Sequence, residues 1–492
     1  MDVALPTRVI DLGPRDGSSI PRLLETHGML GTYIALSYCW GTPSPGGPPN
    51  AITTPSNLEE MRQGIEPERL PKTIRDAIFV ALSLNIQYLW VDALCILQGP
   101  TQEARLDWQH ESTRMVDVYR NAFLTVAAAN APSVHAGFLD HRPRSDHTLL
   151  RVSFRDSQQQ FPRSCYLGLG IVDCGHELKD EPLHRRGWTL QERVLSARIL
   201  SFGMSEFQWH CEELSKHECG KYAPRTRREV SMYDSYAYDP NEWKFIVEQY
   251  SSRSLTIPSD KLPAVSALAT LHSKEEKNWW GLDDIYLAGL WKSTLLKDIL
   301  WYVENRHTDQ MWPEEYRAPS WSWAAIDAGI DYATVGEKSY TELIDYNIQV
   351  AGLNPFGEVT SGWIRLKGPL QQISRFEATK SHLGGHREYV FSCRGRDGDV
   401  IPWGSVMLDA VGNKGLDKIS DEAEATAYLN RTLARFGSDF RALMIRRHHG
   451  VLLLAKATGA PDRHEFRRIG LGWVGHDWKR FLSVGEQTVT II

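Results

Sequence analysis

A short apolar run that ends in a glycine spans Tyr33–Gly41, with the sequence YIALSYCWG. A run of this length and composition predicts a buried strand followed by a turn. The next nine residues, 42–50, contain four prolines and two glycines, which predicts a loop. In an open α/β sheet, ligands usually bind beside the loops that follow the carboxyl ends of buried strands. The end of this strand is therefore a candidate site.

Helical and apolar segments alternate around this run. Helical spacing of apolar residues predicts helices at Thr73–Leu84 and Gln102–Tyr119, and apolar runs predict buried strands at Tyr88–Ile96, Ala122–Ala129 and Arg198–Phe202. Strands that alternate with helices are typical of a parallel sheet with crossover connections. The first part of the chain is therefore predicted to be α/β.

The second half has a different composition. Helical spacing predicts helices at Trp243–Ser251, Lys261–His272 and Leu282–Tyr302, in a section rich in tryptophan. From about residue 340 short alternating runs predict strands, with one helix at Asp421–Arg435. We therefore divide the 492 residues into an α/β domain at 1–215, a helical, Trp-rich section at 216–330 packed on it, and a β-rich domain at 331–492.

The overall charge and hydropathy exclude several classes of partner. The net charge is -6, from 55 basic and 61 acidic residues, which gives no electrostatic reason to expect a nucleic-acid partner. No apolar stretch approaches the roughly 20 residues of a membrane span, and the N-terminus has no signal-peptide pattern. The sequence predicts a cytoplasmic protein that does not act at a membrane.

The common catalytic and metal-binding motifs are absent from the sequence. It contains no phosphate-binding P-loop, dinucleotide glycine fingerprint, Gly-x-Ser-x-Gly elbow or His-Glu-x-x-His zinc motif. Four residues within ten positions could bind zinc by their chemistry, but their spacing is not that of paired zinc knuckles: His210, Cys211, His217 and Cys219. We favour a structural role for these four and predict no metal site.

The segment Arg186–Arg193 (RGWTLQER) carries the strongest chemical signal. Trp188 and Glu192 are four residues apart, so on a helix they share one face. A ring beside a carboxylate can bind a ring-bearing substrate and stabilise a positive charge. The same pair can also be a packed tryptophan beside a surface acid that pairs with Arg193 or Arg198. Asp92, at the end of a predicted strand, is a second candidate acid, although it could cap the next turn.

Several of these segments, in this order, resemble the motifs of the heterokaryon incompatibility (HET) domain of filamentous fungi. They are YIALSYCWG at Tyr33–Gly41, YLWVDALCILQ at Tyr88–Gln98, MVDVYRNA at Met115–Ala122 and RGWTLQE at Arg186–Glu192. Segments at Tyr250–Leu262 and Arg317–Ala324 are similar to sequences that follow the domain. Leu97 departs from the pattern, which often has an acidic or amide residue there.

The resemblance implies a role in non-self recognition, in which the domain triggers cell death when incompatible cells fuse. It also implies a TIR-like (flavodoxin-like) fold, that is, a mostly parallel sheet with flanking helices. Some TIR domains cleave NAD, and their catalytic motif places a tryptophan four residues before a glutamate, as Trp188 and Glu192 are placed here. NAD or a related nucleotide would then be the substrate, and no cofactor would be required.

In this interpretation Glu192 and Asp92 are the catalytic candidates. The nucleotide-binding candidates are the residues that match the loop after the first strand, together with those around the Trp-Glu motif: Ser37, Tyr38, Trp40, Gly41, Arg186 and Trp188. The tryptophans could stack on nicotinamide or adenine, and Arg186 could meet the pyrophosphate.

Three functions remain open at this stage. The first is an NAD glycohydrolase switched on by self-association, and the second is a non-enzymatic signalling module that recruits a HET-signalling partner. The third is an enzyme of specialised metabolism that reuses the fold. A closed, Trp-lined pocket with Glu192 pointing inward would favour an enzyme, whereas Glu192 on an open surface beside an apolar patch would favour a partner module.

Overall fold

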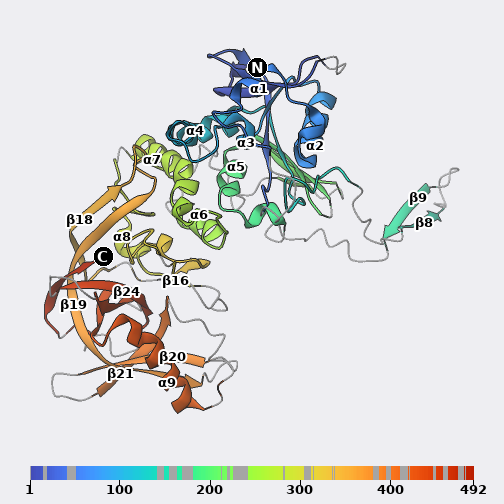
Figure 1. Cartoon of the computed structure of the whole chain (residues 1–492). Helices are drawn as coiled ribbons and strands as arrows, with labels where there is room; N and C mark the ends of the chain where they lie inside the picture. Colours follow the sequence, from blue (N-terminus) through green and yellow to red (C-terminus); the bar gives the residue numbers. More distant parts are fainter. Residues whose placement is uncertain are drawn as a thin grey trace. The chain divides into compact units, whose positions relative to one another are not determined.

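The chain folds into two compact units, Met1–Ala237 and Tyr238–Ile492, in this computed structural model. The structure describes all residues except 1, 15–18, 42–50, 141–148, 155–162, 169–180, 205, 212, 219–221, 225–241, 281–282, 304–311, 314, 335, 337, 381–386, 395–399, 410–418, 420, 447–449, 458–463, 475–480 and 483. The two units are considered separately, with their elements labelled in Figure 1.

The first unit is built on a nine-stranded sheet whose centre is parallel. The four central strands lie in the order β6 (Tyr88–Trp90), β5 (Tyr33–Ser37), β7 (Leu124–Ala127) and β10 (Arg198–Phe202). Each is parallel to its neighbours in this group. The predicted α/β class is thus confirmed.

The outer strands of this sheet are antiparallel, which corrects the expected mostly parallel sheet. These flanking strands are β2 (Arg8–Asp11), β3 (Arg22–Glu25), β11 (Phe207–Cys211), β12 (Leu214–His217) and β13 (Tyr222–Pro224). On this side, β12 and β13 continue the sheet beyond β11. The first sheet therefore extends to Pro224, past the predicted boundary at residue 215.

The crossover helices follow the predicted pattern closely. α2 (Lys72–Ser83) connects β5 to β6, and α4 (Gln102–Asn121) connects β6 to β7, with the Thr101 hydroxyl accepting from the amide of Ala104 at its start. Figure 1 shows α2 on the opposite side of the strands from α4 and α5. The second half of the expected strand Tyr88–Ile96 is instead a helical turn, α3 (Asp92–Cys95).

The chain reverses its direction across the sheet at β5. The next strand in sequence, β6, lies on one side of β5, and β7 lies on the other. All five residues of β5 are buried, as is typical of a central parallel strand covered on both faces. A reversal of strand order opens a crevice at the carboxyl ends of the strands, here where β5 and β7 end.

The second unit begins with helices and tryptophans. α6 (Glu242–Ser251) lies where a helix was predicted. α7 (Ser266–Trp280) overlaps the helix predicted at Lys261–His272 but starts at Ser266, after the 3-10 turn Pro263–Val265. The expected helix over Leu282–Tyr302 is wrong: the described part of this segment forms a hairpin of β14 (Tyr286–Leu287) and β15 (Leu290–Trp291), then α8 (Leu295–Asp298) and the start of β16 (Trp301–Val303). Ala288 and Gly289 have positive φ angles of 44° and 99°, which no continuous α-helix can accommodate.

The hairpin turn organises the tryptophans around it. The carbonyl of Gly289 accepts hydrogen bonds from the indoles of Trp243 and Trp323, at 2.9 and 2.8 Å. A β-carbon at Gly289 would lie 2.7 Å from the indole nitrogen of Trp323. Only glycine therefore suits this turn, and the apolar spacing that predicted a helix reflects the packing of a hairpin.

Beyond the two-stranded sheet of β16 and β17 (Ile330–Tyr332), the described residues of the second unit form an eight-stranded, largely antiparallel sheet and the helix α9 (Glu422–Leu433), in agreement with the β-rich prediction. α9 begins after Asp421, whose carboxylate accepts from the amide of Glu424 at 2.8 Å. The strands are β18 (Glu342–Val350), β19 (Val359–Lys380), β20 (Arg387–Arg394), β21 (Val400–Leu408), β22 (Phe440–Arg446), β23 (Gly450–Lys456), β24 (Glu465–Gly472) and β25 (Glu486–Ile491).

A buried ion pair ties this sheet to the helical section. Arg468 on β24 is 0% exposed and binds the carboxylate of Asp409 at 2.8 Å. Its guanidinium also donates to the carbonyls of Ile299 and Trp301 and lies over the Trp301 ring. The helical, Trp-rich section and the β-rich region thus belong to one compact unit.

Candidate functional site

Glu192 lies on α5 (Thr189–Leu195), a short helix after β7 in the chain. The helix begins at Thr189 rather than at Arg186, and Trp188 is its N-cap residue. Glu192 is 6% exposed, and its Oε2 accepts a hydrogen bond from the Ser37 hydroxyl at 2.5 Å. A surface acid paired with Arg193 or Arg198 is therefore the wrong interpretation. The predicted site residues Ser37 and Glu192 meet, although 155 positions separate them.

The environment of Glu192 favours its protonated form. Burial raises the pKa of this carboxyl from 4.5 to about 7, and the nearby charge of Asp92 raises it further. The hydrogen bonds from Ser37 and Tyr119 and the positive charge of Arg186 oppose this rise. Two buried carboxyls thus feel the charge of one guanidinium, and near neutral pH Glu192 exchanges between its charged and neutral forms.

Asp92 is the first residue of α3, directly after β6 and Val91. Its Oδ2 accepts a hydrogen bond from the indole of Trp40 at 2.9 Å, and its Oδ1 accepts from the amide of Ala93 at 2.7 Å. Burial raises the pKa of Asp92, while Arg186 and these hydrogen bonds hold it down. Asp92 thus fixes the orientation of Trp40, and its charge raises the pKa of Glu192.

Arg186 lies in extended backbone before α5. Its Nη1 donates to the carbonyl of Tyr38 at 2.6 Å. The same guanidinium favours the charged forms of Asp92 and Glu192. Arg186 therefore links the end of β5 to the segment that carries the Trp-Glu motif.

The remaining predicted residues surround this cluster. Trp40 and Trp188 are both partly exposed, and the Trp188 ring packs edge-on against Trp108 with 6.2 Å between centroids. Gly41 has a φ of 80°, and a β-carbon there would lie 2.4 Å from the Cβ of Ser133. The turn after β5 therefore requires glycine, as the run Tyr33–Gly41 predicted.

Tyr119 was not among the predicted site residues. It lies on α4, is 1% exposed, and its hydroxyl is 3.4 Å from the carbonyl of Leu36. Its hydrogen bond with Glu192 lowers the pKa of that carboxyl, while burial and nearby carboxylates raise the pKa of the Tyr119 phenol well above its usual value. The sequence signal for Tyr119 was its place on the apolar stripe of α4, which is also typical of a plain core residue.

Part of the contact between the α5 segment and the sheet is polar. Ser37 donates to Glu192, and the hydroxyl of Ser196, directly after α5, lies 2.6 Å from that of Thr125. The helix also buries Leu190, Val194 and Leu195, so the buried carboxyl lies beside apolar packing, an arrangement that is common at functional sites.

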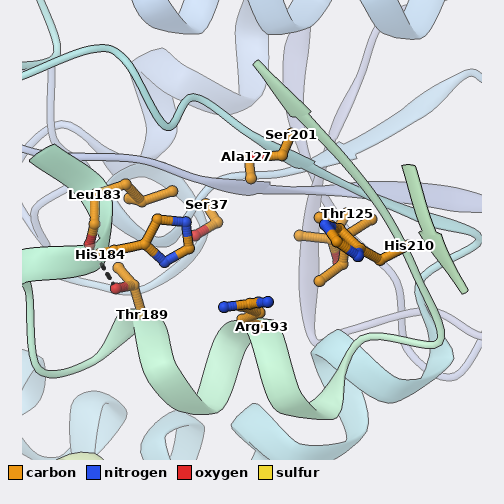
Figure 2. A pocket seen from close by; sticks show the side chains of 10 residues that line it. Ser37, Thr125, Ala127, Leu183, His184, Thr189, Arg193, Ser201 and His210 are labelled. Carbon is orange, nitrogen blue, oxygen red and sulfur yellow. Dashed lines mark hydrogen bonds between the residues drawn. The ribbon is translucent and has the colours of Figure 1, made fainter. Parts of the chain in front are cut away.

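A small cavity of about 20 Å³ lies between α5 and the sheet, next to this contact. Figure 2 shows Arg193 rising from α5 toward the strands, with His184 to one side and His210 to the other. Ser37 lines the cavity while donating to Glu192. The lining includes no tryptophan, so this is not the Trp-lined pocket that an enzyme was expected to have.

The two histidines considered for zinc have other partners. The Nδ1 of His217 lies 2.6 Å from Glu206 Oε1, and the Nδ1 of His210 lies 2.8 Å from the Ser215 hydroxyl. Cys219 lies outside the described residues. Among the described residues, no three His, Cys, Asp or Glu side chains are arranged to hold a metal ion.

The sheet and the buried carboxyls define an α/β domain with a candidate site where its central strand ends. The family model described as "Heterokaryon incompatibility protein (HET)" matches residues 33–192, from the start of β5 to Glu192 itself. The chain therefore contains a HET domain at these residues. No curated protein and no solved structure matches it. In the part of the chain that the structure describes, no helix is both long and apolar enough to cross a membrane.

Proposed function

We propose that the HET domain hydrolyses the nicotinamide–ribose bond of NAD, and that loss of NAD triggers cell death in heterokaryon incompatibility. The observation that carries this proposal is the hydrogen bond from Ser37 to a buried Glu192 at the end of the central strand. The parallel strand order β6-β5-β7-β10 is also that of flavodoxin-like sheets, which supports a TIR-like fold for the domain.

The reaction needs the ionised form of Glu192 rather than its protonated form. Nicotinamide leaves as a neutral base with the electron pair of the broken bond, and positive charge develops on the ribose. Water then adds to the ribose carbon and loses a proton. The ionised form of Glu192 stabilises this charge or holds the ribose hydroxyls. With a pKa of about 7, a sizeable share of Glu192 is ionised at neutral pH.

Other residues of the cluster have supporting roles in this proposal. The partly exposed rings of Trp40 and Trp188 offer surfaces on which nicotinamide or adenine stacks. Asp92 orients the first of these rings through the indole nitrogen. No cofactor is required, since the reaction uses only NAD and water.

A non-enzymatic signalling module is the second candidate. The observation that favours it is the lining of the cavity beside Ser37, which includes no tryptophan and so differs from the pocket expected of an enzyme. The hydrogen bonds that Glu192 makes with Ser37 and Tyr119 would equally suit a structural carboxyl. In that case the domain would recruit copies of itself or a signalling partner without consuming NAD.

An NAD-consumption assay separates the two candidates. The purified chain is compared with Glu192→Gln and with Glu103→Gln, which makes the same chemical change at an exposed position on α4. We expect loss of NAD in wild type and Glu103→Gln and a decrease of at least about 100-fold in Glu192→Gln, the scale of one charge-stabilising group. A concentration series adds a test of self-association, which would make the specific rate rise with protein concentration.

Either of two results would count against the hydrolase. Folded wild-type protein that consumes no NAD at any concentration would favour the signalling module. Consumption that survives Glu192→Gln would mean that another group carries the reaction, and Asp92→Asn would then be measured.

A further inference from the structure

A second cavity of the first unit lies at the other end of the central strand from Glu192. Its volume is about 120 Å³, and it is lined by residues 4–7, by Tyr33 at the start of β5, and by α4. The lining residues of α4, from Glu111 to Asn121, are spaced so that they share one side of the helix. Since about 10–15 Å³ is enough for one water molecule, this cavity has room for a small organic molecule.

Glu111 is a buried acid whose carboxylate is only half satisfied. Its side chain is 3% exposed and lines the cavity, and its Oε1 lies 3.0 Å from the Nδ1 of His110, a side chain that is 61% exposed. No described residue donates a hydrogen bond to the other oxygen, Oε2. Because a buried carboxylate is costly unless its oxygens accept hydrogen bonds, a further donor is expected in the cavity.

Arg114 lines the same cavity and is also incompletely paired. Its Nη1 donates to the hydroxyl of Thr7 at 2.9 Å, and among the described residues its Nε and Nη2 have no acceptor. Three positions separate Arg114 from Glu111 and from Asp117, a spacing at which helical ion pairs often form, yet within the described part of the chain it pairs with neither. A guanidinium and a buried carboxylate therefore line one cavity without neutralising each other.

We propose that this cavity binds a free basic α-amino acid, such as lysine or arginine. The α-ammonium group donates to Oε2 of Glu111, and the α-carboxylate accepts from Arg114. Both groups of the ligand are attached to one carbon atom, and Glu111 and Arg114 are about 4.5 Å apart along the helix axis. A single amino-acid head group therefore reaches both residues.

The rest of the lining suits a long basic side chain. Leu5, Pro6 and Val118 are buried and offer an apolar surface to its aliphatic stem. Asp117 is exposed and pairs with no described residue, so it meets the side-chain cation where the cavity opens to solvent. Two carboxylates and one guanidinium give the lining a net negative charge, which a ligand with a net positive charge balances.

Binding does not depend on the proposed NAD reaction, so it is measured without NAD. Isothermal titration calorimetry of the full chain with L-lysine, and separately with L-arginine, gives the affinity and the number of sites. Three analogues each lack one group of lysine: cadaverine lacks the α-carboxylate, ε-aminocaproate the α-ammonium group, and norleucine the side-chain ammonium group. We expect one lysine per chain and at least about tenfold weaker binding of the first two analogues. Norleucine should bind about two- to fivefold more weakly, since it loses only an exposed ion pair.

Substitutions assign these groups to residues. Glu111→Gln and Arg114→Gln should each weaken lysine binding at least about tenfold, whereas their matched controls at exposed positions of α4, Glu103→Gln and Arg105→Gln, should bind as wild type does. Asp117→Asn changes an exposed residue, so it should fold normally, weaken lysine binding about two- to fivefold and leave norleucine binding unchanged. A thermal melt checks that each variant folds.

Three results would overturn the proposal. The first is that the folded wild-type chain binds neither lysine nor arginine. The second is that folded Glu111→Gln or Arg114→Gln binds lysine as tightly as wild type does. The third is that cadaverine binds as tightly as lysine, which would make the cavity a site for amines, such as a lysine side chain of a partner protein, rather than for an amino acid.

Discussion

Replacing Glu192 by glutamine is expected to stabilise the first unit by an amount that grows as pH rises from 4.5 to about 7. Glutamine keeps the shape of the side chain and still accepts the hydrogen bond that Ser37 donates. What it removes is a charge that the folded protein holds in a buried site. The structure therefore predicts a variant that is less active and more stable.

The magnitude follows from the pKa of Glu192, which rises from 4.5 to about 7 on folding. Below the lower value both states carry the proton, and between the two values only the folded state keeps it. Stability therefore falls as pH rises through this interval, and the full cost is present above about pH 7. Because each pH unit corresponds to about 1.4 kcal/mol, the total cost is about 3 kcal/mol.

Thermal and urea unfolding of wild type and Glu192→Gln from about pH 4.5 to pH 8 tests this reasoning. We expect the two proteins to differ little at the acidic end and the variant to unfold roughly 6–12 °C higher at the alkaline end. Glu103→Gln should differ from wild type by a constant amount. A constant difference for Glu192→Gln as well, or one that shrinks as pH rises, would refute the raised pKa and with it the buried environment of Glu192.

Three further substitutions test other parts of the structure. Ser37→Ala removes a hydrogen bond that lowers the pKa of Glu192, so the pH midpoint of any NAD hydrolysis should move upward, as a pH–rate profile would show. Gly41→Ala places a β-carbon 2.4 Å from a neighbouring side chain at a φ of 80°, and should cost about 1–3 kcal/mol by urea denaturation. Arg468→Met leaves Asp409 charged and buried and should cost about 3–5 kcal/mol, of which Asp409→Asn in the same chain should restore a part. An unchanged denaturation midpoint in either of the last two would contradict the packing described.

The central strands and their helices could be predicted because their apolar patterns are local. β10 (Arg198–Phe202) lies where the sequence predicted it, and α4 starts at the predicted Gln102. The helix predicted over Leu282–Tyr302 failed because the backbone conformation of Gly289 decides that segment and the periodicity does not. The spacing of apolar residues cannot reveal a turn whose carbonyl is held by two tryptophan indoles from other segments.

The site could be predicted only in part, for a similar reason. Ser37, Asp92 and Glu192 were candidates because their segments resemble motifs of the family, and the structure brings them into one cluster. Tyr119 was missed because its contact with Glu192 depends on how α4 and α5 meet, which no spacing within either helix encodes. In the sequence, Arg193 was considered only as a partner of Glu192, whereas in the structure its guanidinium faces the sheet.

The residue after β25 affects the order in which the second unit can fold during synthesis. The amide and hydroxyl of Ser320 both donate to the carbonyl of Ile492, 172 positions later, and the amide of Arg468 donates to the Ser320 hydroxyl at 3.0 Å. During synthesis, the tryptophan-rich segment thus leaves the ribosome long before the partners of Ser320 exist. Contacts between such distant residues form slowly and leave apolar surface exposed in the meantime, so we expect the second unit to depend on chaperones during folding. A chain shortened before β25 should aggregate.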